Sequence, residues 1–435
     1  MTTQSVSCPA IFLSAPSSGE GKTTITAAIA RNFRNQGKVV RVFKTGPDYL
    51  DPQILAQASG EDVEQLDMWM AGEEYCQQKL FEAAQVADLI IVEGAMGMFD
   101  GDPSSADLAA RFNIPIAIVM SVKGMAQTAA AIAGGLANFR DDVKVAGLIA
   151  NHCGTERHAE LIRNALPENL PLLATLPRSE EVALPERHLG LVQASEVSEE
   201  LEQRFTAGAE WVDGQLITEL PAPVTFYSAE TPQVPVLLEG KTIAVAKDEA
   251  FSFIYDANIR LLEEMGARCV FFSPLHDSEL PEADAMWLPG GYPELHCKAL
   301  SANVDMHNQI RGFFDAGKSI LAECGGFLYS LNDLVDLEGE SHPMLGILQG
   351  TGAMRGKRGC QGMQTAVLPE GEVRAHAHHR SRSESTPEPV GHGRRQRHPA
   401  PGEAIYQSRG LTASYLHLFF ASNPEAVARV FGAEC

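Results

Sequence analysis

Residues 14–24 read SAPSSGEGKTT, and this stretch decides the expected fold of the first part of the chain. An apolar run, AIFL, precedes it and a helix-forming run, TITAAIARNF, follows it, which predicts a strand, a tight loop and a helix. Compared with the phosphate-binding pattern G-x-x-x-x-G-K-[ST], the loop has Pro16 where the first glycine would fall. Glycines in such a loop let backbone N–H groups converge on phosphate oxygens at a helix start. The alternative is an ordinary turn that contains G-K-T.

Lys22 and Thr23 carry the expected chemistry of this loop. Lys22 can bridge the terminal phosphates of a nucleotide, and the Thr23 hydroxyl can hold Mg²⁺. Because the loop lies between a predicted strand and a predicted helix, we favour the nucleotide site over the ordinary turn. The residues expected to bind the nucleotide in this loop are Gly19, Gly21, Lys22, Thr23 and Thr24.

Two clusters of acidic residues follow at the ends of later apolar runs, where ligands of open α/β sheets collect. The first reads KTGPDYLDP and the second VEGAMGMFDGD. A carboxylate directly after the run ADLIIV suits Mg²⁺, which takes one or two protein carboxylates besides phosphate oxygens and water. Singly, an Asp in P-D-Y or F-D-G is more often a turn residue. The candidates from both clusters are Lys44, Asp48, Tyr49, Asp51, Glu93 and Asp100.

The wider pattern predicts two α/β domains. Short apolar runs such as VVRVF, IPIAIVMSV and VAGLIAN alternate with amphipathic stretches in the first third, as in a doubly wound parallel sheet covered by helices. Four prolines punctuate residues 208–240, and a second alternating unit begins at KTIAVAKD. We therefore expect an ATP-binding domain at 1–207, a linker at 208–240 and a second domain at 241–435.

Cys324 lies in a setting unlike that of the other cysteines. The sequence SILAECGGFLY predicts an apolar strand, a tight turn that carries the cysteine, two glycines and a helix start. This resembles a nucleophile elbow, in which a strained turn exposes the reactive atom and the following N–H groups form an oxyanion hole. A helix N-terminus also favours the thiolate, which is the attacking species. The alternative is a small buried hydrophobe, the usual fate of a free cysteine.

His417, in ASYLHLFF, is the candidate base for Cys324, although a lone histidine in an apolar run is more often structural. The stretch WLPGGYPEL places Gly290 and Gly291 after another predicted strand, where their N–H groups could hold an oxyanion together with that of Gly325. The order of glycine pair, cysteine elbow and late histidine is that of a triad-type glutamine amidotransferase.

Composition limits the partners. The 45% hydrophobic and 21% charged fractions are those of a globular protein, and no apolar run is long enough for a membrane span. A net charge of -22 argues against nucleic acid as the main partner. The opening residues lack a basic leader, so we expect a cytoplasmic protein. Residues 354–404 look irregular and rich in His and Arg, which favours an exposed basic loop.

Taken together, the motifs resemble the corrinoid branch of the glutamine amidotransferases, the family of cobyrinic acid a,c-diamide synthase and cobyric acid synthase. The resemblance covers nearly the whole chain, with a first part similar to dethiobiotin synthetase and a last part similar to class I glutaminases. It rests on these stretches: APSSGEGKTT, KTGPDYLDP, VEGAMGMFDG, LPRSEEVALPERHLGLV, FSFIYDAN, LPGGYPEL, ECGGFLY and SYLHLFFASNP.

The resemblance implies an ATP- and glutamine-dependent ligase that amidates the a and c carboxylates of cobyrinic or hydrogenobyrinic acid through an acyl phosphate. It implies that Asp48 and Glu93 join Thr23 around Mg²⁺, and that Asn151 reads the purine of ATP. Tyr49, Asp51 and Asp100 would position or process the substrate carboxylate, with Lys44 neutralising charge. No membrane partner is expected, and a homodimer is the candidate assembly.

The chain also departs from the family pattern. Many class I glutaminases have Glu two residues after the histidine, whereas this chain has Phe419, so we expect a pair of Cys324 and His417 without a strict third member. Where relatives read close to R-G-H-x-F-H-x-S, residues 374–381 read RAHAHHRS. The alternatives are another amide ligase of the family, such as cobyric acid synthase, or a partner-binding ATPase of the ParA or MinD kind. The ATPase would have no glutaminase domain.

Overall fold

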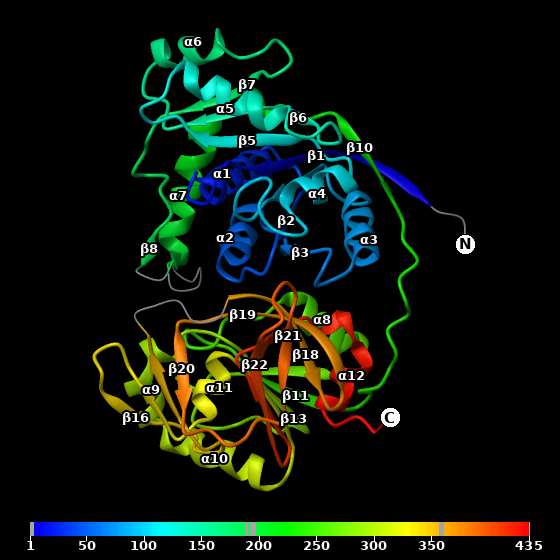
Figure 1. The fold of residues 1–435 in the computed structure, drawn as a ribbon, viewed down its shortest axis with the longest axis vertical. Helices are drawn as coiled ribbons and strands as arrows, with labels where there is room; N and C mark the ends of the chain where they lie inside the picture. Colours follow the sequence, from blue (N-terminus) through cyan, green and yellow to red (C-terminus); the bar gives the residue numbers. More distant parts are fainter. Residues whose placement is uncertain (1–3, 188–189, 192–196, 356–360, 435) are drawn as a thin grey trace. The chain divides into compact units, whose positions relative to one another are not determined.

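The computed structural model describes residues 4–187, 190–191, 197–355 and 361–434 (Figure 1). The chain divides into two compact units, 1–231 and 232–435. The predicted linker, 208–240, spans this division. Its first part belongs to the first unit, because a helix extends into it to Val212 and the strand Pro223–Tyr227 pairs antiparallel with the first strand of the chain.

The first unit is built on an eight-stranded sheet in the order β3-β2-β4-β1-β5-β6-β7, with β10 pairing with β1. Apart from β10, the pairs within this sheet are parallel. The strands are β1 (Ser5–Ser14), β2 (Val40–Thr45), β3 (Glu64–Leu66), β4 (Leu89–Glu93), β5 (Ile116–Ser121), β6 (Val145–Asn151), β7 (Leu172–Leu176) and β10 (Pro223–Tyr227), with a separate two-stranded pair of β8 (Glu186–Arg187) and β9 (Gly190–Leu191). The helices are α1 (Lys22–Asn35), α2 (Leu50–Ser59), α3 (Glu73–Ala84), α4 (Ser105–Arg111), α5 (Gln127–Ala137), α6 (Glu156–Arg163), α7 (Ser198–Val212) and the 3₁₀ turn η2 (Leu216–Thr218).

Helices cover both faces of this sheet, so its strands are apolar on both sides. In β4, for example, Leu89 and Ile91 pack with α1, α2 and α7 on one face, whereas Ile90 and Val92 pack with α3, α4, α5 and α6 on the other. This two-sided burial explains the continuous apolar runs in the sequence. It confirms the predicted doubly wound α/β fold, and it brings the carboxyl ends of β1, β2 and β4 together at one edge.

The second unit has a ten-stranded mixed sheet in the order β12-β11-β13-β14-β23-β22-β21-β18-β19-β24 and a four-stranded sheet in the order β16-β15-β17-β20. The strands are β11 (Thr242–Ala246), β12 (Arg268–Phe272), β13 (Ala285–Leu288), β14 (Ser319–Glu323), β15 (Asp333–Val335), β16 (Ser341–Pro343), β17 (Thr351–Met354), β18 (Gln361–Leu368), β19 (Gly371–His378), β20 (Ser381–Glu384), β21 (Gly391–Arg395), β22 (Pro401–Ser408), β23 (Leu411–Ser414) and β24 (His417–Leu418). The helices are α8 (Asp256–Glu264), α9 (Cys297–Ala302), α10 (Val304–Asp315), α11 (Gly325–Ser330) and α12 (Pro424–Val430), with 3₁₀ turns η3 (Pro293–Leu295) and η4 (Phe420–Ser422).

The expectation of an irregular exposed loop at 354–404 is wrong for the part of that segment that the structure describes. Strands β18 to β22 occupy most of it, and β18 pairs with β19 over eight register positions. In β19 the residues Val373, Ala375 and Ala377 are buried, whereas Glu372, Arg374 and His378 are exposed, which is close to the alternation of a strand with one covered face. The exception is His376, which is also buried. Because the apolar positions of β19 include small alanines between Arg and His residues, the alternation was not recognised in the sequence. Residues 356–360 of this segment, and 188–189 and 192 of the motif at 176–192, lie outside the described residues.

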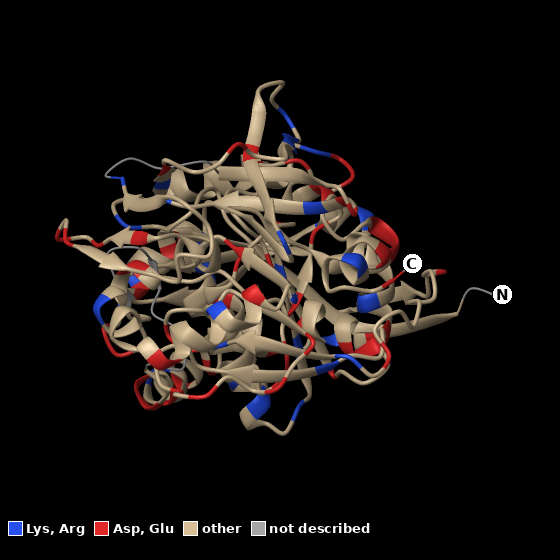
Figure 2. Ribbon diagram, turned by 90° about the horizontal axis from the view of Figure 1, so that it is seen from below, with Lys and Arg blue, Asp and Glu red and all other residues tan. Residues whose placement is uncertain are grey.

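Charges are spread widely over the chain. In Figure 2, Lys and Arg residues are interspersed with Asp and Glu along the coloured ribbon. None of the helices in the described ranges is both long and apolar enough to span a membrane.

Candidate functional site

The phosphate-binding loop connects the end of β1 to the start of α1. Gly21 is the N-cap of α1 at φ +92°, a conformation that only glycine adopts without strain, and Gly19 has φ +84°. A Cβ atom at Gly21 would lie 2.5 Å from Nδ2 of Asn151, which donates a hydrogen bond of 2.9 Å to the carbonyl oxygen of Glu20. The backbone N–H groups of the first turn, where Thr23 and Thr24 lie, are available for phosphate oxygens. Asn151, at the end of β6, borders the loop, and its role toward the purine stays a prediction.

The amine of Lys22 contacts two backbone carbonyls, one in this loop and one in the segment after β4. Its Nζ donates to the carbonyl oxygen of Met96 at 2.9 Å and to that of Ser17 at 3.3 Å. Burial, followed by repulsion from Lys44, lowers the pKa of Lys22. A phosphate would be a stronger partner than two neutral carbonyls, because charge-assisted hydrogen bonds are the stronger kind.

A charged cluster lies beside the loop at the carboxyl edge of the sheet. Nζ of Lys44, on β2, is 2.6 Å from Oδ2 of Asp51, 2.6 Å from Oε1 of Glu93 and 3.7 Å from Oδ2 of Asp48. Thr23, on α1, donates to the same oxygens, at 3.2 Å to Asp51 and 3.0 Å to Glu93. The structure thus brings four candidates from both acidic motifs close to Thr23 of the phosphate-binding loop. These candidates are Lys44, Asp48, Asp51 and Glu93.

The pKa values in this cluster follow from burial and close charges. Burial lowers the pKa of Lys44, but the surrounding carboxylates outweigh it and hold that pKa well above its usual value. Burial raises the pKa of Asp51, but attraction by Lys44 and hydrogen bonds outweigh it, so that pKa falls. Burial and the nearby Asp51 together raise the pKa of Asp48 to about 7. An additional cation beside Asp48 would therefore favour its ionised form near neutral pH.

The donor atoms of this cluster fit a magnesium ion. Glu93 is fully buried, and its Oε2 has no hydrogen-bond partner within the described residues, although Oε1 has two. A buried carboxylate oxygen without a partner is unfavourable unless a cation binds there. Carboxylate and hydroxyl oxygens are the ligands that Mg²⁺ prefers, and Thr23 and Asp48 supply more of them.

The remaining candidates of the first unit lie at the same edge. A Cβ atom at Gly97 would lie 2.3 Å from Oδ2 of Asp100 and 2.7 Å from the carbonyl oxygen of Pro16, so the Asp100 carboxylate lies close to the phosphate-binding loop. Tyr49 directly precedes α2 and follows Asp48. Their roles toward a substrate stay predictions.

In the second unit, Cys324 occupies the strained turn that its sequence predicted. It connects β14 to α11 with φ +45° and ψ -98°, in the left-handed half of conformational space that non-glycine residues rarely enter. The turn is held by its neighbours, since the Cys324 N–H donates to the carbonyl oxygen of Ser414 at 2.8 Å and its carbonyl oxygen accepts from the N–H of Leu328 at 3.0 Å. Burial raises the pKa of the Cys324 thiol.

The glycine pair lies between the cysteine turn and the histidine. A Cβ atom at Gly290 would lie 2.3 Å from Cε1 of His417, and one at Gly325 would lie 2.8 Å from the backbone N of Gly291. A Cβ atom at Gly291 would lie 2.0 Å from the carbonyl oxygen of Ala250. Side chains are therefore excluded sterically from all three glycines, and the same loop contacts His417 and the residue after Cys324.

His417 is buried on β24, and the pairing of β24 with β19 sets it opposite His376. The two imidazole rings stack with centroids 4.8 Å apart and an interplanar angle of 11°. Burial, with smaller contributions from His378 and His379, lowers the pKa of His417 to about 3. His417 is therefore neutral at physiological pH. Phe419 is fully buried and contacts Tyr255 at 5.8 Å between ring centroids, so the position expected for a third member holds no acid.

Two residues near this site were not predicted. His376 lies in the segment taken for an exposed loop, and its register with His417 could not be read from the sequence. Glu323, directly before Cys324, is buried and accepts hydrogen bonds from Trp287 and from the backbone of Leu418. The signal for Glu323 was present, since an acidic residue ends the otherwise apolar run SILAE.

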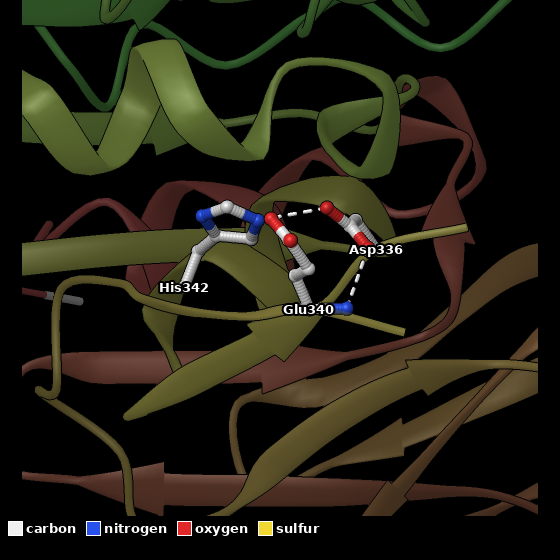
Figure 3. A group of neighbouring side chains, drawn as sticks. All are labelled: Asp336, Glu340 and His342. Atoms are coloured by element: carbon white, nitrogen blue, oxygen red, sulfur yellow. Dashed lines mark hydrogen bonds and ion pairs between the residues drawn. The ribbon is translucent and has the colours of Figure 1, made fainter. Parts of the chain in front are cut away.

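One further group of metal-binding residue types lies in the hairpin of β15 and β16 (Figure 3). Asp336, Glu340 and His342 present ligand atoms within 4.8 Å of one another. Their contacts are those of a tight turn. Asp336 accepts hydrogen bonds from the backbone N–H of Glu338 at 3.0 Å and of Glu340 at 2.8 Å, and its other oxygen lies 2.8 Å from Nε2 of His342. These hydrogen bonds stabilise the turn between β15 and β16, and they explain why the three side chains lie close together.

Comparison with known proteins gives matches to both units. Residues 11–192 match the family model of the CobQ/CobB/MinD/ParA nucleotide binding domain, and residues 242–425 match that of the CobB/CobQ-like glutamine amidotransferase domain. The chain is 49% identical to hydrogenobyrinate a,c-diamide synthase of Stutzerimonas stutzeri, over 97% of this chain and 98% of the relative. It is 47% identical to the protein of the same name in Pseudomonas aeruginosa, over 97% of both chains. It is also 44% identical to cobyrinate a,c-diamide synthase of Herminiimonas arsenicoxydans, over 100% of this chain and 99% of the relative.

Proposed function

The chain belongs to the family of the hydrogenobyrinate and cobyrinate a,c-diamide synthases, and from this premise we propose that its two sites perform successive halves of one amidation. The protein is an ATP- and glutamine-dependent ligase of cobalamin biosynthesis that forms carbon–nitrogen bonds at the a and c carboxylates of a corrinoid. The observation that supports this most directly is the presence, in one chain, of two sites. One is a phosphate-binding loop beside a carboxylate cluster, and the other is a cysteine elbow and a buried histidine that both border the loop of Gly290 and Gly291.

The first unit activates the substrate carboxylate. Lys22 and the N–H groups at Gly19, Gly21 and Thr24 bind the phosphates of ATP, while Asn151 contacts the purine. Attack of a corrinoid carboxylate on the terminal phosphorus forms a C–O–P linkage, breaks the bond to the bridging oxygen and releases ADP. Activation is needed because a free carboxylate is a poor acceptor for an amine.

The charged cluster supports this step. Thr23, Asp48 and Glu93 would hold Mg²⁺, which when bound neutralises charge on the phosphate oxygens. Lys44 forms ion pairs with Asp51 and Glu93 and adds a positive charge beside the phosphate-binding loop. Asp51 and Asp100, with Tyr49, orient the incoming carboxylate. Local cations of this kind let a protein of net charge -22 accept an acidic substrate.

The second unit supplies ammonia. Sγ of Cys324 attacks the side-chain carbonyl carbon of glutamine, and His417 takes the thiol proton and passes it to the leaving nitrogen. N–H groups from Gly290, Gly291 and Gly325 stabilise the oxyanion of the tetrahedral intermediate. Ammonia leaves, water hydrolyses the glutamyl thioester to glutamate, and the thiol is restored.

Ammonia then attacks the acyl phosphate, so that a C–N bond forms and inorganic phosphate leaves. The cycle runs twice, once at each of the two carboxylates. Because it consumes ATP and glutamine, we place the protein in the cytoplasm, and we retain a homodimer as the assembly that light scattering would test. A partner-binding ATPase would have no glutaminase domain, whereas residues 242–425 match one.

The function is tested with cobyrinic acid and hydrogenobyrinic acid in separate reactions with ATP, Mg²⁺ and glutamine. Mass spectrometry should detect two successive amidations of at least one of these substrates. In Cys324→Ser, glutamine-driven amidation should fall more than about 1,000-fold, while amidation from ammonium salt persists. Failure to amidate either substrate would refute the assigned substrate class, and loss of both nitrogen sources in the serine variant would refute the model of separate sites.

A further inference from the structure

Glu323 is a buried carboxylate that contacts two other strands of the glutaminase unit. Its side chain lies at the end of β14 and is 2% exposed. Oε2 accepts a hydrogen bond of 2.8 Å from Nε1 of Trp287 on β13, and Oε1 accepts one of 2.7 Å from the backbone N–H of Leu418 on β24. Trp287 is fully buried and Leu418 is 4% exposed, so both bonds are shielded from water.

Each strand joined in this way carries a different part of the proposed active site. Cys324 directly follows Glu323, His417 directly precedes Leu418, and β13 leads through Pro289 to Gly290. In the described sheet β24 pairs with β19 and not with β14. The Leu418 N–H therefore bonds to the Glu323 side chain where a neighbouring strand would otherwise supply a backbone acceptor. The Glu323 carboxylate thus connects β14, which precedes Cys324, to β24, which carries His417. It also connects β14 to β13, which precedes the glycine loop.

The His417 ring has close neighbours, so a movement of its strand would change its position in the site. A Cβ atom at Gly290 would lie 2.3 Å from Cε1 of His417, so the glycine loop leaves little room for the ring to move on that side. The ring also stacks on His376, with the two centroids 4.8 Å apart. A small shift of β24 relative to β14 would change the distance between the imidazole and the thiol, and a misplacement of about 1 Å can reduce a rate about 100-fold.

We propose that Glu323 is a positioning residue of the glutaminase, which fixes the strand of His417 against the strand of Cys324. The inference rests on the proposed function of the second unit. Both partners of the Glu323 carboxyl group are N–H donors, and each of its two oxygens accepts from one of them. Burial raises the pKa of Glu323 to about 8, and these two hydrogen bonds oppose that rise by favouring the ionised form. A glutamine has one acceptor oxygen, and its amide nitrogen would face one of the two donors. Glu323→Gln therefore removes one connection with almost no change of volume.

The test measures glutamine hydrolysis by the full-length protein. Glu323→Gln should lower kcat for hydrolysis about 100-fold while KM for glutamine changes less than about threefold, and ammonium-driven amidation should stay at the wild-type rate. Asn303→Ala is the matched control for stability, because Asn303 caps α10 and its Nδ2 donates to the carbonyl oxygens of Pro274 and Asp277, none of which is assigned to the proposed site. Its kcat per folded molecule should equal that of the wild type.

A double variant separates positioning from general damage. Trp287→Phe removes one of the two N–H donors that compete for the single amide oxygen in Glu323→Gln, so that oxygen is left to accept from Leu418. The double variant should therefore hydrolyse glutamine at least about tenfold faster than Glu323→Gln alone. If it does not fold, Glu323→Asp replaces it, and the shortened carboxylate should lower kcat with KM unchanged.

The outcomes separate this inference from the proposed function. A wild-type protein that does not hydrolyse glutamine would refute the proposed function itself. An active wild type with an equally active Glu323→Gln would refute the positioning role alone. The role would also be refuted if Glu323→Gln lost activity only in proportion to its unfolded fraction, or if a folded double variant were no faster than the single variant.

Discussion

The two sites hold their reactive groups by different physical means. In the first unit, Lys44 lies 2.6 Å from both Asp51 and Glu93, and the groups are held by opposite charge. In the second unit, Cys324 and His417 are buried, and burial favours the neutral form of each. Backbone strain at Cys324 and close contacts at Gly290 fix their positions instead. The first site is therefore sensitive to loss of a charge, and the second to changes of shape.

The largest effect is expected from removing a charge in the first unit. Glu93→Gln removes a carboxylate from Lys44, from Thr23 and from the proposed metal site. Amidation from glutamine and from ammonium should both fall on the order of 100- to 1,000-fold, because electrostatic stabilisation of the phosphoryl group is lost. Glutamine hydrolysis should remain.

Both activities are read from glutamate release and from the mass of the corrinoid product. Glu202→Gln is the control in the same unit, since it alters an ion pair with the Arg31 guanidinium at a partly exposed position. It should leave amidation nearly unchanged. Full activity of Glu93→Gln would remove Glu93 from the site.

A change of shape should affect the second unit alone. In Gly290→Ala the new methyl group would lie 2.3 Å from Cε1 of His417, so the ring or the loop must move. Glutamine hydrolysis should fall about 10- to 100-fold, whereas ammonium-driven amidation continues. Gly21→Ala should give the opposite pattern, because its methyl group would meet Asn151 at 2.5 Å and its φ is +92°. Equal losses of both activities in either variant would contradict independent sites.

Much of this arrangement was predictable from local sequence. The strands and helices of the first unit follow from apolar periodicity, and the cysteine turn follows from the strand, Cys324 and two glycines. The clustering of Lys44, Asp48, Asp51 and Glu93 was expected because the carboxyl ends of parallel strands meet at one edge.

The failures concern contacts between distant segments. The register that sets His376 opposite His417 joins two strands far apart in the chain, and no local pattern encodes it. The strands within 354–404 were missed because alanines replaced the larger apolar residues by which alternation is recognised. Glu323 was missed because its partners, Trp287 and Leu418, come from two other strands.

The neutral state of the cysteine site predicts how its thiol responds to pH. Burial raises the pKa of Cys324, so the thiol should stay protonated near pH 7 in the protein without substrate. With the pKa of His417 at about 3, the imidazole does not provide a positive charge that would stabilise a thiolate. The rate of Cys324 alkylation by iodoacetamide should therefore keep rising above pH 9, by about tenfold per pH unit.

Peptide mass spectrometry would follow Cys324 separately from the other cysteines, with Cys324→Ser as the control for its assignment. A rate that levels off below pH 7 would show a preformed thiolate and imidazolium pair. The cysteine site would then be organised by charge, as the first site is, and the contrast between the two would disappear.

The smallest effect should come from a glycine that serves neither site. Gly312 lies within α10, and a Cβ atom there would have no neighbour within 4 Å. Gly312→Ala should stabilise the second unit by about 0.5–1 kcal/mol, because alanine loses less backbone entropy in a helix. Hydrogen exchange of α10 peptides should slow, with glutamine hydrolysis unchanged. If hydrolysis fell as far as in Gly290→Ala, general sensitivity of the unit to substitution, rather than contact with His417, would explain the effect at Gly290.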